Sequence, residues 1–245
     1  MDKLEVLNDW LNKSKNIVVF AGAGMSCPSG IPDFRSANGI YFEKFKGYLN
    51  PEAIVSHSFF KSNPKLFYEF YFKHMVYLDA KPNMCHMYFS KLQETKNISV
   101  ITQNIDGLDK IAGIKDVIEL HGTIWSNHCE KCHKFYKLED IYNKQIPTCS
   151  CGGIIKPDVV LYEEALDENK IVSAIKKIQS ADMLIVIGTS LVVYPAASFI
   201  NYYTGDKLVI INKDKTSGDK LADLVINDDI INVIKELQDE WFYRF

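Results

Sequence analysis

The stretch from Gly22 to Arg35 gathers residue types that could do chemistry. Gly22 and Gly24 expose bare backbone, whose N–H groups can approach a phosphate because no Cβ stands in the way. A helix N-terminus behind such a turn would add a partial positive charge. An acid, an aromatic ring and a guanidinium then follow at Asp33, Phe34 and Arg35. The stretch does not match the full GxGxxG fingerprint of dinucleotide-binding proteins. We therefore predict a dinucleotide-binding turn, with a purely structural turn as the alternative.

Four of the six cysteines form a second candidate site. Cys129 and Cys132 are separated by two residues, sixteen residues follow, and Cys149 and Cys151 are separated by one. The first pair and the gap match a zinc ribbon, whereas the CxC pair needs a tighter bend that the two following glycines could supply. Four thiolates fill a tetrahedral shell, so the prediction is one structural Zn²⁺, with free thiols as the alternative.

The remaining two cysteines lie far from this cluster in the sequence. Cys27 and Cys85 are both expected to carry no metal. Because Cys27 lies beside the glycine turn, a reactive thiol remains a second possibility for it.

A histidine and three amide or acid side chains follow neighbouring predicted strands. His121 stands in the motif ELHG, and Gln103, Asn104 and Asp106 stand in TQNIDGL. An imidazole that titrates near neutrality can take a proton from a hydroxyl at cellular pH. A lone histidine after a strand is more often a core residue, but its polar neighbours favour a general base here.

The elements that must position these residues alternate between strand and helix. Helices are expected in the first fifteen residues, at 82–94, around 171–178, from 195 and at 230–241. Short apolar runs predict strands at 17–20, 98–101, 117–120, 183–187, 208–211 and 224–226. This α/β alternation requires a parallel sheet covered on both faces, and ligands of such sheets lie at the carboxyl ends of the strands.

An aromatic-rich segment at 40–78 interrupts that alternation and predicts two or more short helices. Its aromatic side chains are expected to form core, with a groove for an apolar acyl chain as the alternative. The 245 residues carry a formal net charge of -3, which gives no basic face for nucleic acid or an anionic membrane. Without a signal region or an apolar run of about 20 residues, the protein is expected in the cytoplasm.

Taken together and in order, seven features of the chain resemble the sirtuins, the NAD-dependent protein lysine deacylase family. They are GAGMSCPSGIPDFRS, TQNIDGL, ELHG, the four cysteines, KPDVVLYEEAL, GTSLVVYPAA and the strand ending at Asn212. The resemblance implies a Rossmann-like domain (1–40, 80–122 and 155–245) and a small helical and zinc-binding domain (41–79 and 123–154). NAD and the acylated lysine of a protein would meet between them, in a chain expected to be monomeric.

The resemblance also assigns roles to individual residues. His121 would be the general base, Asn104 a second catalytic residue, and Val159, Val160, Leu161 and Tyr162 would pair with the substrate peptide as an added strand. The NAD pocket implied by the resemblance comprises Gly22, Ala23, Gly24, Ser26, Cys27, Asp33, Phe34, Arg35, Gln103, Asn104, Ile105, Asp106, His121, Gly188, Thr189, Ser190, Asn212, Lys213, Asp229 and Ile230.

The implied reaction starts when the acyl oxygen of the lysine attacks the anomeric carbon of NAD and nicotinamide leaves. His121 then activates a ribose hydroxyl, which takes over the acyl group. Relatives that act on acidic acyl chains carry a tyrosine and, three residues later, an arginine, where this chain has Tyr71 and His74. Tight capture of a succinyl carboxylate is therefore not expected.

Three other functions remain alternatives at this stage. Mono-ADP-ribosyl transfer shares the first bond cleavage, and an oxidoreductase could use the same glycine turn to bind NAD. A zinc-ribbon module that binds nucleic acid or protein without catalysis is disfavoured by the acidic balance of the chain.

Overall fold

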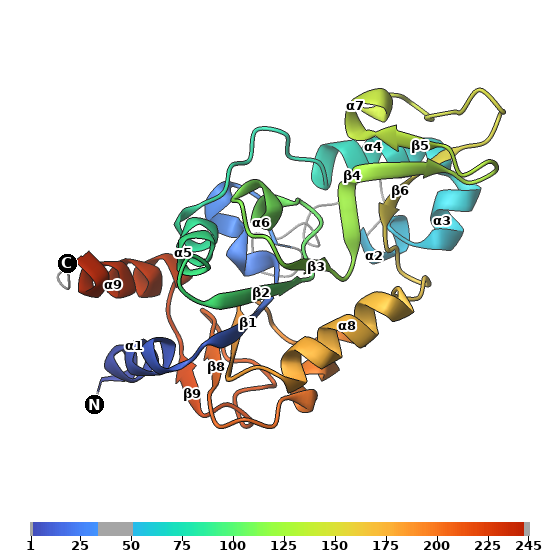
Figure 1. Ribbon diagram of the computed structural model, residues 1–245. Coiled ribbons are helices and arrows are strands. Elements are labelled where there is room, and N and C mark those ends of the chain that lie inside the picture. The colour runs from blue at the N-terminus through green and yellow to red at the C-terminus, as the bar shows by residue number, and fades with distance from the viewer. Residues whose placement is uncertain (1, 34–50, 243–245) are drawn as a thin grey trace.

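A six-stranded parallel sheet forms the larger of two structural units. The computed structural model describes residues 2–33 and 51–242, so that Phe34 and Arg35 lie outside the described residues (Figure 1). The strand order is β3-β2-β1-β7-β8-β9, and every neighbouring pair is parallel. The strands are β1 (Asn16–Ala21), β2 (Asn97–Thr102), β3 (Val117–Glu119), β7 (Met183–Ile187), β8 (Leu208–Ile211) and β9 (Leu224–Ile226). The predicted α/β class is confirmed.

Helices cover both faces of this sheet, because its central strands are apolar on both sides. Leu7 of α1 (Lys3–Lys13), Phe89 of α5 (Met84–Leu92) and Val233 of α9 (Ile230–Phe242) belong to the core on one face. The opposite core contains Ala174 of α8 (Glu168–Gln179) and Phe199 of the 3-10 helix η4 (Ala196–Tyr202). The short α6 (Leu108–Ile111) follows β2.

The segment after β1 begins with short turns in place of a long helix. It forms two short 3-10 turns, η1 (Ala23–Met25) and η2 (Cys27–Ser29), and η2 ends at Gly30 in the left-handed conformation with φ 85°. Because each turn has only three residues, few peptide dipoles add up at its N-terminus. The positive charge expected behind the glycine turn is correspondingly small.

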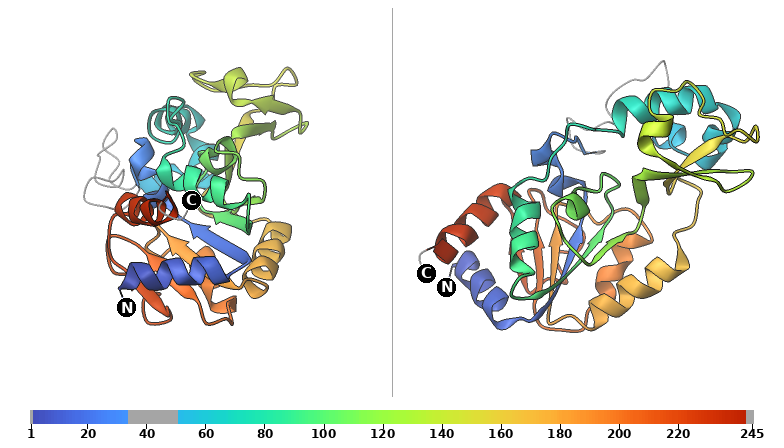
Figure 2. Two further views of the ribbon diagram at one scale, coloured as in Figure 1. Left: turned by 60° about the vertical axis from the view of Figure 1, so that its left-hand side comes forward. Right: turned by 45° about the horizontal axis from the view of Figure 1, so that its top comes forward.

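In the described residues, the smaller unit combines a three-stranded antiparallel sheet with four short helices. The sheet has the order β5-β4-β6 and contains β4 (Gly122–Cys129), β5 (Phe135–Lys137) and β6 (Ile155–Val159). The helices are α2 (Pro51–Ile54), α3 (His57–Ser62), α4 (Pro64–His74) and α7 (Leu138–Ile141). Figure 2 shows this unit at the opposite end of the molecule from α1 and α9.

Most of the large aromatic side chains of the smaller unit form its core, whereas Tyr77 lies at the cavity described below. Phe60, Phe67, Tyr68, Phe70 and Tyr71 are buried in one cluster with the inner face of the small sheet. Their rings meet mainly edge to face, as between Phe60 and Phe67, whose centroids lie 5.0 Å apart. The core interpretation of this segment therefore holds for these five rings.

The pairing of β6 bears on where one unit ends and the other begins. Ile155–Val159 alternates buried and half-buried residues and pairs with β4, not with the large sheet. We therefore propose that the smaller unit extends to Val159, and not only to residue 154 as the sequence suggested. Among the described residues, no helix has both the length and the apolar character needed to cross a membrane.

Candidate functional site

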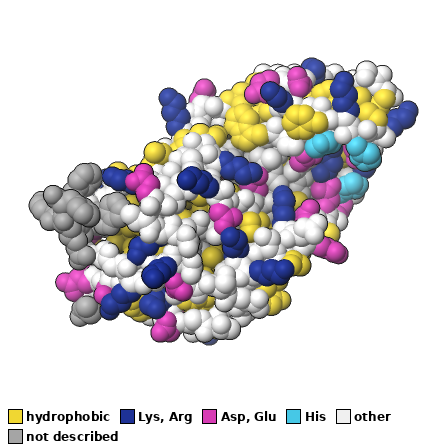
Figure 3. All heavy atoms as spheres, viewed as in Figure 1, with side chains coloured by type: hydrophobic (Ala, Val, Ile, Leu, Met, Phe, Trp, Pro, Cys, Tyr) yellow, Lys and Arg dark blue, Asp and Glu magenta, His cyan; other side chains and the backbone are white. Residues whose placement is uncertain are grey.

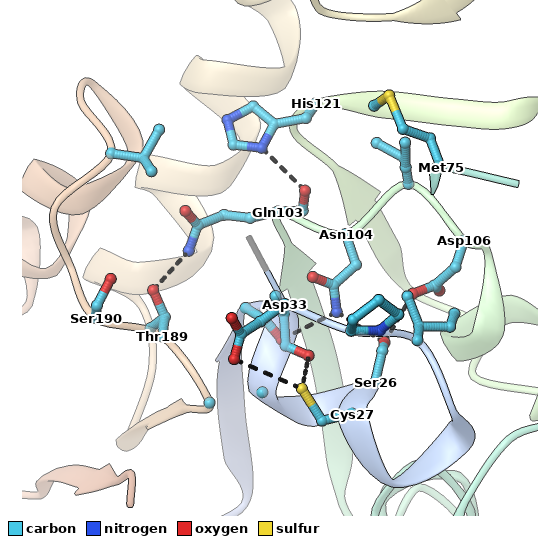
Figure 4. Close-up of a pocket in the computed structure, with 18 of the residues that line it drawn as sticks. Ser26, Cys27, Asp33, Met75, Gln103, Asn104, Asp106, His121, Thr189 and Ser190 are labelled. Atoms are coloured by element: carbon cyan, nitrogen blue, oxygen red, sulfur yellow. Dashed lines mark hydrogen bonds between the residues drawn. The ribbon is translucent and has the colours of Figure 1, made fainter. Parts of the chain in front are cut away.

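The carboxyl ends of the parallel strands open into a cavity of about 890 Å³ that the smaller unit closes from the other side. Figure 4 shows part of its wall. All described residues predicted from the sequence for the NAD pocket, for catalysis and for the substrate peptide line it: Gly22, Ala23, Gly24, Ser26, Cys27, Asp33, Gln103, Asn104, Ile105, Asp106, His121, Val159, Val160, Leu161, Tyr162, Gly188, Thr189, Ser190, Asn212, Lys213, Asp229 and Ile230.

The glycines of the first turn are required by packing between two loops. The turn after β1 lies against the turn after β7, where Gly22 N donates to Ile187 O at 3.0 Å and Gly24 N donates to Gly188 O at 2.8 Å. A Cβ on Gly22 would come within 2.5 Å of Thr189 Cβ, and one on Gly24 within 2.8 Å of Gly188 Cα. Access to a phosphate was the reason expected for these glycines, whereas this contact between two backbones is what requires them here.

His121 lies between β3 and β4, and one hydrogen bond holds its ring. Its Nδ1–H donates to the carbonyl oxygen of Gln103 at 2.9 Å (Figure 4). A carbonyl can only accept, so the proton of the neutral ring is on Nδ1 and Nε2 keeps its lone pair. Burial lowers the pKa of His121 from its ordinary 6.5, the Gln103 carbonyl opposes this shift, and the charge of Lys170 adds to it. The ring is therefore a neutral base at neutral pH.

Asn104 is fixed by a network that joins the turns after β1 and β2. Its Nδ2 donates to Gly22 O and to Ser26 Oγ, both at 3.0 Å. The Ser26 hydroxyl in turn donates to Asp106 Oδ2 at 2.7 Å, and Asp106 Oδ1 accepts the Leu108 N–H at 2.8 Å. Burial raises the pKa of Asp106, and its two hydrogen bonds oppose that shift. The amide of Asn104 thus has one orientation before any ligand enters.

Cys27 lines the same cavity as a protonated thiol. Burial raises the pKa of its thiol above the ordinary value of 9.0, and the nearby Asp33 carboxylate raises it further. Its Sγ lies 3.4 Å from Ala23 O and 3.9 Å from Asp33 Oδ2. Since the thiolate is the reactive form, this environment argues against a nucleophilic role for Cys27.

The segment Val159–Tyr162 forms another part of the wall and is tied to both units. Val160 N donates to the carbonyl oxygen of His121 at 2.9 Å. Tyr162 N donates to Val55 O at 3.1 Å, and His57 N donates to Tyr162 O at 3.0 Å. The segment is therefore extended backbone held beside His121.

Several cavity residues were missed from the sequence. They are Pro28, Ile31, Pro32, Val55, Met75, Tyr77, Glu163, Glu164, Leu166, Val193, Tyr194, Pro195, Asp214, Lys215 and Asp228. Most of them adjoin predicted site residues, and extending each motif by a few positions would have found them. Val55, Met75 and Tyr77 come from the helical segment and have no local signal. Tyr71 is buried in the core, so of the pair considered for acyl selectivity only His74 reaches the cavity.

The four clustered cysteines converge at one end of the smaller unit. Their sulfur atoms all lie within 4.8 Å of one another, with 3.4 Å between Cys129 and Cys151 and 3.6 Å between Cys132 and Cys149. Four thiolates about 2.3 Å from a zinc ion would have sulfurs at similar separations. The donor set therefore fits one structural Zn²⁺ with no open position.

The CxC spacing is made possible by the glycines that follow it. Gly152 has φ 80°, and its N–H donates to Cys149 O at 2.9 Å. Gly153 lies so close to the cluster that a Cβ there would come within 2.6 Å of Cys129 Sγ. The tight bend expected from the sequence is confirmed, and Gly153 has a second role in leaving room for the sulfur.

The comparisons with known proteins cover nearly the whole chain. Residues 22–195 match the model of the Sir2 family. An NAD-dependent protein deacetylase of Clostridium perfringens (strain 13 / Type A) is 52% identical over 242 residues, which cover 97% of this chain and 99% of that protein. An NAD-dependent protein deacetylase of Staphylococcus aureus (strain Mu50 / ATCC 700699) is 45% identical over 239 residues, covering 97% and 98%.

Solved structures agree with this relationship. A structure of Sir2 with a p53 peptide and NAD+ has a TM-score of 0.86 and 39% identity, covering 99% of this chain and 100% of that one. A structure of Sir2 bound to an acetylated peptide has a TM-score of 0.85 and 38% identity, covering 98% of each chain. From the matched family model, the full-length relatives and the shared fold, we conclude that this chain belongs to the Sir2 family.

Proposed function

We propose that this protein is an NAD-dependent protein lysine deacetylase. The proposal is carried by the neutral imidazole of His121, whose Nε2 keeps its lone pair inside a cavity large enough for a dinucleotide. It is supported by relatives at 52% and 45% identity that carry this activity in their names.

The residues around the cavity fit NAD by the chemistry of their groups. The turn after β1 and the amides of Gln103 and Asn104 offer hydrogen bonds, and Lys213 adds a cation near the end of β8. We infer that Ala23, Gly24 and Ser26 hold the diphosphate, as the sequence predicted. When bound, NAD supplies a ribose carbon to which the acyl oxygen of the lysine can bond as nicotinamide departs.

Within this proposal the residues of the chain bind, orient and move one proton. His121 Nε2 accepts the proton of a sugar hydroxyl, and the Nδ1–H bond to Gln103 O steadies the imidazolium that results. Asn104 presents an amide oriented by Gly22 and Ser26. Val159–Tyr162 holds the peptide backbone next to the His121 carbonyl.

We infer that the substrate is a protein with an acetylated lysine. We also infer that the enzyme is a monomer and that it acts in the cytoplasm. A structural site of four reduced thiolates is compatible with a reducing compartment. Light scattering tests the oligomeric state, which follows from neither the fold nor the relatives.

A product assay tests the proposed function. Purified protein with NAD and an acetyl-lysine peptide is expected to release nicotinamide and deacetylated peptide in equal amounts, both identified by mass. Accumulation of NADH would instead identify an oxidoreductase. Mass added to the peptide or the protein as ADP-ribose, with the acetyl group retained, would identify ADP-ribosyl transfer, and either result would contradict the proposal.

A further inference from the structure

The loop from Leu161 to Glu164 closes the proposed peptide segment with a turn whose conformation is unusual for its residues. Glu164 N donates to Leu161 O at 3.0 Å, and Glu163 in the third position has φ 74°. A turn with positive φ at that position normally carries glycine or asparagine. A strained residue next to a binding segment suggests that its side chain has a role in holding the segment.

Glu163 offsets this strain with contacts to α3. Its Oε2 accepts the Ser58 N–H at 2.8 Å, and its Oε1 accepts the Ser58 hydroxyl at 2.9 Å. The turn is thereby joined to the first turn of α3, where backbone N–H groups have no partner within the helix.

Glu164 makes three hydrogen bonds, one within its own loop, one to β6 and one to α3. Its Oε2 accepts the Leu161 N–H at 2.8 Å and the Lys156 ammonium at 3.0 Å, and its Oε1 accepts His57 Nδ1–H at 2.8 Å. Only 21% of its side chain is exposed, and Lys156 is 17% exposed. The three bonds lower the pKa of Glu164 against the opposing effect of burial, so the carboxylate is charged at neutral pH.

Lys156 extends this network to the peptide segment itself. Its ammonium also donates to the Val159 carbonyl oxygen at 3.0 Å. Glu164 therefore holds the segment from both sides, through the Leu161 N–H directly and through the Val159 carbonyl by way of Lys156. Figure 3 shows a group of histidines with neighbouring Asp and Glu side chains at the right-hand end of the molecule, where Figure 1 places α3 and β6.

We propose that Glu164 is a positioning residue for the acetylated peptide. Its carboxylate fixes the extended segment Val159–Tyr162 against α3 and β6, so that the segment stands ready to receive a peptide strand. The bond from Val160 N to the His121 carbonyl then places that strand relative to the base. This inference rests on the proposed deacetylase function.

Steady-state kinetics of the full chain test the role of Glu164. In Glu164→Ala the Leu161 N–H, Lys156 and His57 lose their acceptor, and the segment loses its fixed position. We expect the KM for an acetyl-lysine peptide to rise on the order of tenfold, because hydrogen bonds to a charged group are lost. The KM for NAD and kcat should stay close to those of the unchanged protein, since the segment binds the peptide.

Glu164→Gln is the conservative variant that should restore binding. Its Oε1 can accept from Leu161 N and Lys156, and its Nε2 can donate to His57 Nδ1 in the other neutral tautomer. The peptide KM is expected to return near the original value. Asp116→Ala is the matched control, because the Asp116 carboxylate also accepts hydrogen bonds from a serine, Ser99, and a lysine, Lys177. Asp116 lies at the end of β3 away from His121 and does not line the cavity, so its loss should leave the peptide KM unchanged.

The outcomes separate the inference from the proposed function. If the unchanged protein removes no acetyl group, the deacetylase proposal fails before any variant is compared. If it does, an unchanged peptide KM in Glu164→Ala overturns the inference, and so does a Glu164→Gln variant that is as impaired as the alanine variant. An equal rise in the KM for NAD also overturns it. Should Glu164→Ala not fold, His57→Ala replaces it as the test, because it removes only the hydrogen bond between the half-exposed His57 and Glu164. This variant must still raise the KM for the peptide and leave the KM for NAD unchanged.

Discussion

Replacement of His121 tests the proposed chemistry most directly. Asparagine at this position can still donate to the Gln103 carbonyl but offers no nitrogen lone pair, so the variant His121→Asn removes the base and keeps the hydrogen bond. General base catalysis typically contributes 10² to 10⁴ in rate. We therefore expect kcat/KM to fall by that factor, which corresponds to about 3 to 5 kcal/mol of transition-state stabilisation.

The pH dependence gives the same prediction a second readout. Burial lowers the pKa of His121 below 6.5, so the ring is neutral and active above that pH and becomes protonated only as the pH falls further. The acid limb of kcat/KM should thus have its midpoint below pH 6.5 in the unchanged protein. In His121→Asn this limb should disappear, because the group that titrates is gone.

The assay is nicotinamide release at saturating acetyl-lysine peptide, with NAD affinity measured separately by titration calorimetry. NAD is expected to bind His121→Asn with nearly unchanged affinity. His86→Gln is the control, because it replaces another buried histidine that does not line the cavity. A His121→Asn variant with near-normal kcat/KM, or an acid limb that persists in it, would refute the assignment of the base.

Three further predictions concern metal and stability. Removing zinc with a chelator, or replacing Cys132 by serine, should unfold the smaller unit, because structural zinc sites contribute on the order of 10 kcal/mol to folding; protein purified under reducing conditions that contains no zinc by elemental analysis would contradict the site. Burial lowers the pKa of His86 from 6.5 to about 4. Between these pH values the unfolded chain binds a proton at His86 and the folded protein does not, so the free energy of unfolding should fall as the pH drops from 6.5 towards 4. The variant His86→Gln keeps an acceptor for the Asn83 N–H and does not titrate, so at pH 4 urea unfolding should recover up to about 3 kcal/mol of the stability that the unchanged protein loses. If the variant and the unchanged protein lost the same stability in acid, His86 would not be the cause. Burial raises the pKa of Asp109 from 3.8 to about 7, so the folded protein keeps a proton there that the unfolded chain has lost, and the free energy of unfolding falls as the pH rises from 3.8 through 7. The variant Asp109→Asn should therefore be more stable than the unchanged protein by about 4 kcal/mol at pH 8 but not at pH 3. Equal stabilisation at both pH values would exclude titration of Asp109 as the cause.

The sequence by itself determined the large sheet and the cysteine cluster. A five-residue apolar run such as Met183–Ile187 is typical of a strand buried on both faces, and the helical periodicity between such runs leaves few topologies other than a covered parallel sheet. In such a sheet the carboxyl ends of neighbouring strands meet at one edge. Local motifs at those ends, including His121 and Asn104, were therefore predictable as neighbours without coordinates.

The tertiary structure decided which distant segments meet and why certain residues are required. The place of β6 in the small sheet depends on its partner β4, and no local pattern in Ile155–Val159 names that partner. The glycines after β1 are required by the turn after β7, which lies more than 160 residues away in the sequence. Glu164 reads as one of two consecutive surface acids until folding brings His57 and Lys156 to its carboxylate. The reason is common to all three: hydrogen bonds and close contacts act over a few ångströms in space, whatever the separation along the chain.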